Sequence, residues 1–120
     1  MTLTDFVAGS YLSEEERAFL WQEDSITGDL PFQEDRLAMI RDVGFQDLDV
    51  MDITGRAVTQ QERMLEESYR HKTAIVEDVG IDLWLNWVEC AEVYGRMFAE
   101  RKLLCLRIGA RKANGAPYGP

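Results

Sequence analysis

Few side chains in this sequence could carry out acid–base chemistry, and the first of them is the single histidine, His71. A neutral imidazole could take a proton from the hydroxyl or amine of an acceptor molecule. The neighbours Arg70 and Lys72 are instead typical of a solvated helix face. His71 is therefore the one candidate catalytic residue, and an exposed structural position is the favoured interpretation.

Carboxylates offer a second kind of chemistry, and three of them are close in sequence. The alternation around Asp47, Asp49 and Asp52 predicts a strand that puts the first two on one face and the third on the other. The cluster is thereby split, so we expect solvated carboxylates and no metal site. Asp5 is the better candidate, because it ends a predicted strand at 2–7 and the carboxyl ends of strands border ligand clefts.

The two cysteines, Cys90 and Cys105, have no spacing suited to zinc. Each lies in an apolar pattern, so we expect both thiols to be buried and unreactive. A chain of this size needs no disulfide, and a reducing cytoplasmic location is expected.

Aromatic side chains are the main candidates for contacts with a small molecule. Trp84, Trp87 and Phe98 recur at helical spacing, which is also the pattern of a core-facing helix and favours burial. Tyrosines in the middle of a helix can bury the ring and present the hydroxyl. The candidate substrate-binding residues are Tyr11, Trp21, Phe32, Tyr69, Trp84, Trp87 and Tyr94.

The composition narrows the classes of function. The chain has 120 residues, of which 46% are hydrophobic and 29% charged, which suits one small globular domain and excludes a disordered chain. Its 13 basic and 22 acidic residues give a net charge of −9, which disfavours nucleic acids and anionic membranes as partners. No apolar run approaches the roughly 20 residues of a membrane span. The first residues also lack the pattern of a signal peptide.

Periodicity and capping residues predict the elements that must position these side chains. Ser13 with Glu16, and Thr59 with Glu62, have the spacing of a capping box, and Gly44 and Gly80 are placed to end helices. The expected elements are a strand at 2–7, helices at 13–23 and 33–43, a strand at 45–53, helices at 59–79 and 82–98, and a strand at 103–111.

The last predicted strand begins with a nearly continuous apolar run, Leu103–Leu106. Such a run is typical of a strand that is paired on both sides. Leu104, Leu106, Ile108 and Ala110 alternate along it and are expected on one face.

Six segments, in order, resemble the C-terminal half of class I small-molecule methyltransferases that use S-adenosylmethionine. The likeness is greatest to sarcosine/dimethylglycine N-methyltransferases and to sugar O-methyltransferases of antibiotic pathways. Each motif is short, and it is their order and spacing that carry the resemblance. The segments are LTDF at 3–6, DRLAMIRDVGF at 35–45, VMDIT at 50–54, RMLEESYRHK at 63–72, LNWVECAEVY at 85–94 and LLCLRIGARK at 103–112.

The resemblance implies an α/β, partial Rossmann-like fold. The family's sheet has the strand order 3-2-1-4-5-7-6, and the strands of this chain would be 5, 7 and 6, in a three-stranded mixed sheet with four helices. The implied methyltransferase half covers residues 1–112, with lid segments at about 9–32 and 55–100, and a flexible tail follows at 113–120.

The family's cofactor-binding half has no counterpart in this sequence. A nucleotide site needs glycines close together so that the backbone can approach the ligand. Here no G-x-G occurs, and the glycines before the tail are widely separated, from Gly9 to Gly109. The resemblance therefore implies that S-adenosylmethionine would be bound mainly by a partner chain.

Three functions remain open at this point. In the first, the chain is the acceptor-binding or lid subunit of a split, heterodimeric methyltransferase that acts on a small metabolite, and its partner pairs with the edge of strand 2–7. In the second, two copies pair along this edge to form a homodimer that binds a ligand or acts as a scaffold without methyl transfer. In the third, the chain is a self-contained binding module or a cyclase-like enzyme.

Overall fold

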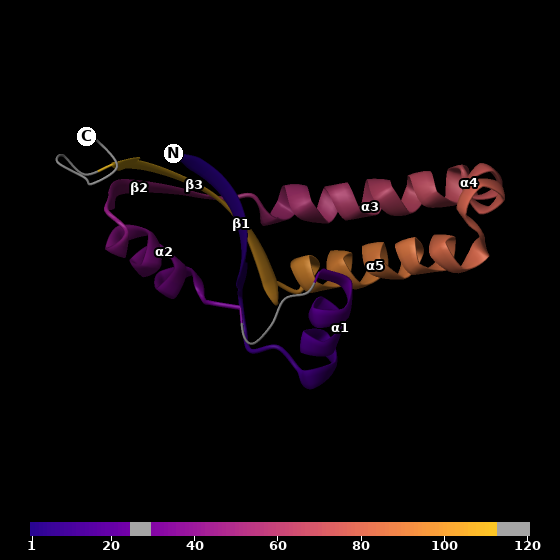
Figure 1. The fold of residues 1–120 in the computed structure, drawn as a ribbon, viewed down its shortest axis with the longest axis horizontal. Helices are drawn as coiled ribbons and strands as arrows, with labels where there is room; N and C mark the ends of the chain where they lie inside the picture. Colours follow the sequence, from indigo (N-terminus) through magenta and orange to yellow (C-terminus); the bar gives the residue numbers. More distant parts are fainter. Residues whose placement is uncertain (25–29, 113–120) are drawn as a thin grey trace.

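The computed structural model describes residues 1–24 and 30–112, so the predicted tail and part of the first lid segment lie outside the described residues. The described residues form three strands and five helices (Figure 1). In chain order the elements are β1 (Thr2–Ala8), α1 (Glu14–Asp24), α2 (Gln33–Asp42), β2 (Phe45–Asp52), α3 (Thr54–Arg70), α4 (Lys72–Val79), α5 (Ile81–Ala99) and β3 (Leu103–Lys112).

The three strands form one sheet in the order β1-β3-β2. β3 pairs antiparallel with both neighbours, from Ala8 opposite Leu103 in β1 to Phe45 opposite Lys112 in β2. The predicted central position of the last strand is confirmed, as is the order implied by the resemblance. The prediction of a mixed sheet is wrong for the described strands, because both pairings are antiparallel and β1 and β2 never meet.

Side chains of β3 are buried on both faces of the sheet, because helices cover both faces. Leu106 and Ile108 are fully buried on the face that packs against Ile40 of α2, together with Val7 of β1. Leu104 and Ala110 pack on the same face, as their alternation predicted.

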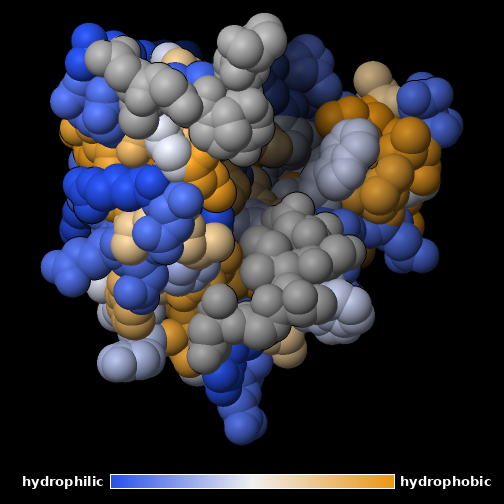
Figure 2. Space-filling model, turned by 60° about the vertical axis from the view of Figure 1, so that its left-hand side comes forward, coloured by the Kyte–Doolittle hydropathy of each residue, from blue (hydrophilic) through white to orange (hydrophobic). Residues whose placement is uncertain are grey.

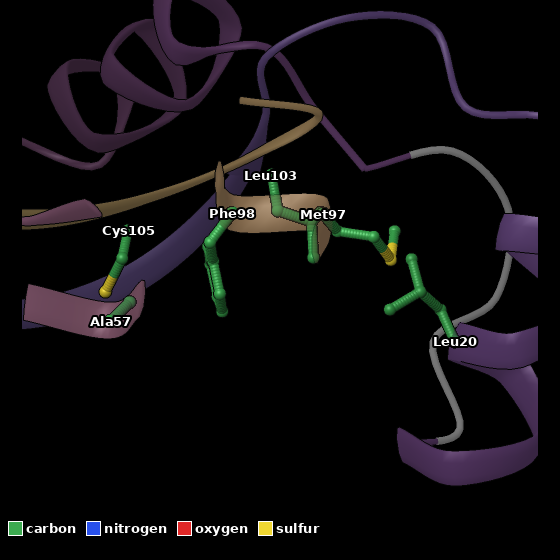
Figure 3. Packing of buried hydrophobic residues seen from close by; sticks show 6 residues of the cluster. All are labelled: Leu20, Ala57, Met97, Phe98, Leu103 and Cys105. Carbon is green, nitrogen blue, oxygen red and sulfur yellow. The ribbon is translucent and has the colours of Figure 1, made fainter. Parts of the chain in front are cut away.

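The opposite face of the sheet packs against α1, the first turn of α3 and the last turn of α5. Leu103 and Cys105 of β3 contact Phe98 and Met97 there, and Figure 3 shows Met97 reaching toward Leu20 of α1. Helices attached to different strands are thus held together by one apolar cluster.

Helices α3 and α5 form a long hairpin that projects from the sheet, with α4 at its far end (Figure 1). A single helix over 59–79 was predicted, but α3 begins at Thr54 and a break at His71 separates α3 from α4. The early start has a local cause, because Asp52 accepts hydrogen bonds from both the backbone N–H and the hydroxyl of Thr54. Thr59, the predicted cap, instead donates to the carbonyl of Gly55 inside the helix.

The projecting hairpin makes the molecule elongated. Its radius of gyration is 17.6 Å, whereas a compact domain of this length would have about 13.6 Å. On the face seen in Figure 2, hydrophobic residues (orange) reach the surface between hydrophilic ones (blue). Half-exposed apolar side chains include Phe6 of β1 at 40% and Met64 of α3 at 48%.

One edge of β1 is largely unpaired within the described residues. The backbone groups of Met1 and Gly9 form hydrogen bonds on the side of β3. The backbone N–H and C=O groups of the odd-numbered residues of β1 therefore point toward β3, and those of the even-numbered residues point outward. Along the outward edge, the N–H of Ala8 reaches the carbonyl of Pro31. The outward backbone of Thr4 has no such neighbour among the described residues.

Two glycines fix the chain at close approaches and turns. A Cβ at Gly9 would lie 2.0 Å from the carbonyl oxygen of Arg101, so only glycine lets β1 leave the sheet beside the turn that starts β3. Gly44 has φ +103° and ends α2, as predicted.

Candidate functional site

The carboxyl ends of β1 and β2 lie at the same end of the sheet, since both strands run antiparallel to β3. α3 begins at this end, and α5 finishes there just before β3. Ligand clefts of open α/β sheets lie at such an end. It is therefore the first place to look for a binding site.

A small hollow of about 60 Å³ lies directly after β1. It is lined by Ala8 at the end of β1, by Ser10 and Leu12 after the strand, and by Leu30 before α2. Two predicted site residues complete it: the ring of Tyr11, 89% exposed, meets the edge of the Phe32 ring with centroids 5.3 Å apart. The structure thus brings together Tyr11 and Phe32, which the sequence separates by 21 positions.

A hydrogen-bonded group at the end of β2 was missed by the sequence analysis. Asp52 accepts from Thr54 and from the guanidinium of Arg101, at 2.5 and 2.7 Å. Thr54 is 2% exposed, and its hydroxyl oxygen accepts the backbone N–H of Cys105. The sequence signal was the Asp-x-Thr spacing, which favours local side-chain bonds at a helix start.

The pKa of Asp52 reflects these contacts. Burial acts to raise the pKa, but the hydrogen bonds from Thr54 and Arg101 outweigh it and lower the pKa from 3.8 to about 2. Asp52 is therefore a charged structural group at neutral pH that fixes the start of α3 against the turn before β3.

Asp5 does not stand at the end of its strand as predicted, because β1 continues to Ala8. Its carboxylate lies 2.9 Å from the guanidinium of Arg36 on α2, and it also accepts the backbone N–H of Phe6. Both oxygens are engaged, so Asp5 joins β1 to α2 within this chain. Its predicted place at the edge of a cofactor cleft stays a prediction.

The predicted aromatic residues of the hairpin are separated from the strand ends. Trp84 is 3% exposed, and its indole N–H donates to the carbonyl of Ser68 at 2.7 Å, so the structural interpretation is confirmed for it. Tyr69 meets the edge of the Trp84 ring at 5.3 Å, and the ammonium group of Lys72 lies 4.4 Å from that ring. These contacts tie α3, α4 and α5 together.

Trp87 and His71 line an open, mainly apolar groove of about 430 Å³ on one side of the hairpin. His71 lies at the far end of α3, whose 17 residues span about 25 Å, so it is far from the strand ends. Its Nε2 lies 3.1 Å from Glu67, and its side chain is 57% exposed, as expected for a solvated helix face. Cys90 is half-buried in the same groove, so the prediction of two buried thiols is confirmed only for Cys105.

The thiol of Cys105 is 5% exposed, and burial, with smaller contributions from Asp52 and Asp5, raises its pKa. A raised pKa favours the protonated thiol, which is the less reactive form, and the reactivity itself stays a prediction.

The two remaining predicted residues lie on α1 and α5. Trp21 of α1 is 57% exposed, facing away from Leu20 and the core. Tyr94 of α5 packs against Phe19 and Phe98 with centroid distances of 5.2 and 6.2 Å. Its hydroxyl is buried without a hydrogen-bond partner among the described residues, so it is not presented to solvent.

The described residues offer neither a metal site nor a membrane-spanning helix. Within residues 1–24 and 30–112, no group of three or more His, Cys, Asp or Glu side chains is placed to hold a metal ion. In the same residues, no helix is both long and apolar enough to span a membrane.

Comparison with known proteins shows a likeness in structure alone. No protein-family model and no curated protein matches the sequence. Two solved structures of phosphoethanolamine N-methyltransferase 2 from Haemonchus contortus match at 18% identity, with TM-scores of 0.81 and 0.80. The first is a complex with phosphomonomethylethanolamine and S-adenosylhomocysteine, the second with S-adenosyl-L-methionine.

The match extends over 93% of this chain but only 26% of the Haemonchus contortus chain. At this identity it shows the fold: the chain has the α/β fold of part of a class I methyltransferase. The fold implied by the sequence resemblance is confirmed, whereas the sarcosine and sugar methyltransferase subfamilies find no particular support.

Proposed function

We propose that this chain is the acceptor-side half of an S-adenosylmethionine-dependent methyltransferase that acts on a small metabolite, and that a second polypeptide supplies the cofactor-binding half. The observation that carries the proposal is the match of nearly the whole chain to about a quarter of an N-methyltransferase. In this proposal, the second polypeptide supplies the remaining part of the catalytic fold.

The hollow after β1 does not fit the cofactor. An adenosyl group with a methionine tail needs a pocket of at least about 300 Å³ and closely spaced glycines. The hollow after β1 has about 60 Å³, and no G-x-G occurs in the sequence. No step of methyl transfer is therefore assigned to a cofactor bound by this chain alone.

The outward edge of β1 is the proposed contact with the partner. Its backbone groups around Thr4 are available for a further strand, and Phe6 leaves 40% of its surface uncovered beside that edge. An open edge with apolar side chains next to it normally has to be covered in a stable protein. A parallel strand added here would continue the sheet beside β1.

The hollow after β1 is the proposed contact with the acceptor. Tyr11 and Phe32 supply aromatic surface, and the hydroxyls of Tyr11 and Ser10 can orient a polar group. The exposed Trp21 on α1 is the proposed cover of the acceptor. Such residues contribute to methyl transfer by holding the acceptor in line with the methyl group and by excluding water.

The test is co-expression with a protein that is encoded nearby and carries a G-x-G turn. We expect the two chains to co-purify, to bind S-adenosylmethionine in calorimetry, and to methylate an amine acceptor. Phosphoethanolamine is the first acceptor to try, because the neighbours in structure are named for it. Co-purification without cofactor binding would contradict the proposal.

A pair of matched variants tests the strand edge. Thr4→Pro removes an outward N–H and blocks pairing, but it leaves the bonds from β1 to β3, whereas Thr4→Val keeps the edge. We expect only the proline variant, and not Thr4→Val, to lose binding of the partner in pull-down and calorimetry. If both variants bind the partner equally well, another surface holds the two chains together.

The alternative, a non-catalytic homodimer formed through the same edge, gives a different result. Light scattering would then find a dimer of the chain without any partner, and Thr4→Pro would convert it to a monomer.

A further inference from the structure

The hydroxyl of Tyr94 is a buried polar group without a hydrogen-bond partner. Tyr94 lies on α5, and no described residue bonds to its hydroxyl oxygen. The indole of Trp84 on the same helix is also buried, but its N–H donates to the carbonyl of Ser68. Buried polar groups without a partner are uncommon, and each lowers the stability of a fold. The Tyr94 hydroxyl therefore calls for an explanation outside the packing of this chain.

The packing of Tyr94 depends on its ring and not on its hydroxyl. The ring meets Phe19 of α1 edge-on, with centroids 5.2 Å apart, and stacks on Phe98 of α5 at 6.2 Å with an interplanar angle of 25°. Both contacts join aromatic rings, so a phenylalanine at position 94 could make them equally well. Among the described residues, the hydroxyl thus adds a cost to folding and makes no contact that offsets it.

Tyr94 lies near the end of the sheet where the hollow after β1 is found, and not at the tip of the hairpin. It precedes Ala99, the last residue of α5, by five residues, which is a rise of about 7.5 Å. It packs against the apolar cluster drawn in Figure 3. Leu12 and Leu30, which line the hollow, pack against the same cluster. One apolar cluster therefore adjoins both the hollow and the tyrosine.

Helix α1 packs on this tyrosine and has few buried side chains. Of its described side chains only Leu20 is buried, and Phe19 is half-buried against the Tyr94 ring. An ion pair between Glu16 and Lys102, at 2.9 Å, adds to the attachment. Elements with few buried apolar contacts can open at a low free-energy cost. A ligand can therefore displace the Phe19 ring and reach the hydroxyl.

The chemistry of a phenol sets what this ligand must offer. The hydroxyl has one O–H donor as well as lone pairs, and buried donors without a partner are rarer than acceptors with unused lone pairs. The matching ligand group is therefore an oxygen atom that accepts a hydrogen bond. An isolated charge is costly in apolar surroundings, so a hydroxyl, ether or ester oxygen fits better than a charged oxygen.

We propose that the Tyr94 hydroxyl donates a hydrogen bond to an uncharged oxygen of the methyl acceptor once Phe19 has moved aside. This role rests on the proposed function and adds a residue of α5 to the acceptor site. The acceptor is then a small molecule that carries a hydroxyl, ether or ester oxygen besides the group that receives the methyl. Tyr94 selects such acceptors over analogues that lack the oxygen.

The first measurement uses the chain alone and compares two tyrosine-to-phenylalanine variants. Tyr94→Phe removes the unpartnered hydroxyl, so we expect the thermal unfolding midpoint to rise by about 3–6 °C. Tyr69→Phe is the matched control, because Tyr69 is 54% exposed, and we expect it to unfold at the midpoint of the parent. An unchanged or lower midpoint for Tyr94→Phe would overturn the proposal, because the hydroxyl would then have a partner within the chain.

The second measurement uses the complex with the partner chain and two matched acceptors. Phosphoethanolamine has an ester oxygen, and 3-aminopropylphosphonate has a methylene group in its place. We expect Tyr94→Phe to raise the KM for phosphoethanolamine about tenfold, as the loss of one hydrogen bond predicts. The KM for 3-aminopropylphosphonate and the affinity for S-adenosylmethionine should not change.

The outcomes separate this role of Tyr94 from the proposed function. If the parent complex methylates phosphoethanolamine and Tyr94→Phe keeps the parental KM, only the role of Tyr94 is overturned. An equal rise in KM for both acceptors would overturn it too, because the ester oxygen would then not be the group that Tyr94 contacts. A parent complex that binds no S-adenosylmethionine, or that methylates neither compound, would contradict the proposed function and this role with it.

Discussion

At the scale of single residues, a few polar contacts decide where elements begin. Ser13 and Glu16 exchange hydrogen bonds between side chains and backbone at the start of α1, as their spacing predicted. Glu16 also contacts Lys102 at 2.9 Å. Burial acts to raise the pKa of Glu16, but the bonds from Ser13 and Lys102 outweigh it and lower the pKa.

Asp52 gives a prediction at this scale. Its folded pKa, about 2, lies below 3.8, so its stabilisation is present above the unfolded pKa and is lost as the pH falls through the folded value. Its side chain is 42% exposed, which reduces the contribution through solvent screening. Asp52→Asn should therefore cost about 1 kcal/mol at neutral pH and clearly less near pH 2, where about half of the folded molecules carry a protonated Asp52.

Urea denaturation at a series of pH values measures this difference. Asp49→Asn is the control, because that side chain is exposed and has no ion pair among the described residues. A cost for Asp52→Asn that stays the same at pH 2 would show that the charge contributes nothing.

At the scale of elements, a glycine-to-alanine substitution should have opposite effects on stability at the turn after β1 and at the start of α3. Gly9→Ala places a Cβ 2.0 Å from the carbonyl oxygen of Arg101, so the backbone must move, at a cost of about 2 kcal/mol or more. Gly55→Ala meets no atom within 4 Å and removes helix-weakening flexibility, which should stabilise the protein by about 0.5–1 kcal/mol. Thermal unfolding of the two variants compares these effects. If the Gly9→Ala protein is as stable as the parent, the turn after β1 and the turn before β3 lie further apart in solution than in this structure.

At the scale of the whole molecule, the sheet is narrow and the hairpin extends away from it (Figure 1). For the monomeric chain in solution, small-angle X-ray scattering should give a radius of gyration near 17.6 Å. A compact domain of this length would instead give about 13.6 Å. The smaller value would mean that the hairpin folds back over the sheet.

The sequence by itself determined most of the elements and the strand order. The nearly continuous apolar run Leu103–Leu106 predicted a strand that is paired on both sides, and β3 does pair with β1 on one side and β2 on the other. The capping box at Ser13 was equally readable, because its two partners are three residues apart. Local periodicity and short spacings carry this information without any knowledge of the tertiary structure.

Only the tertiary structure decided which of the predicted site residues meet. It joined Tyr11 to Phe32, buried Trp84 in the hairpin, and placed Trp87 beside His71 far from the strand ends. It also began α3 at Thr54, where contacts with Asp52 and Cys105 outweigh the capping pattern at Thr59. A pocket depends on contacts between residues distant in sequence, and helical spacing alone cannot tell a core-facing ring from one that faces a groove.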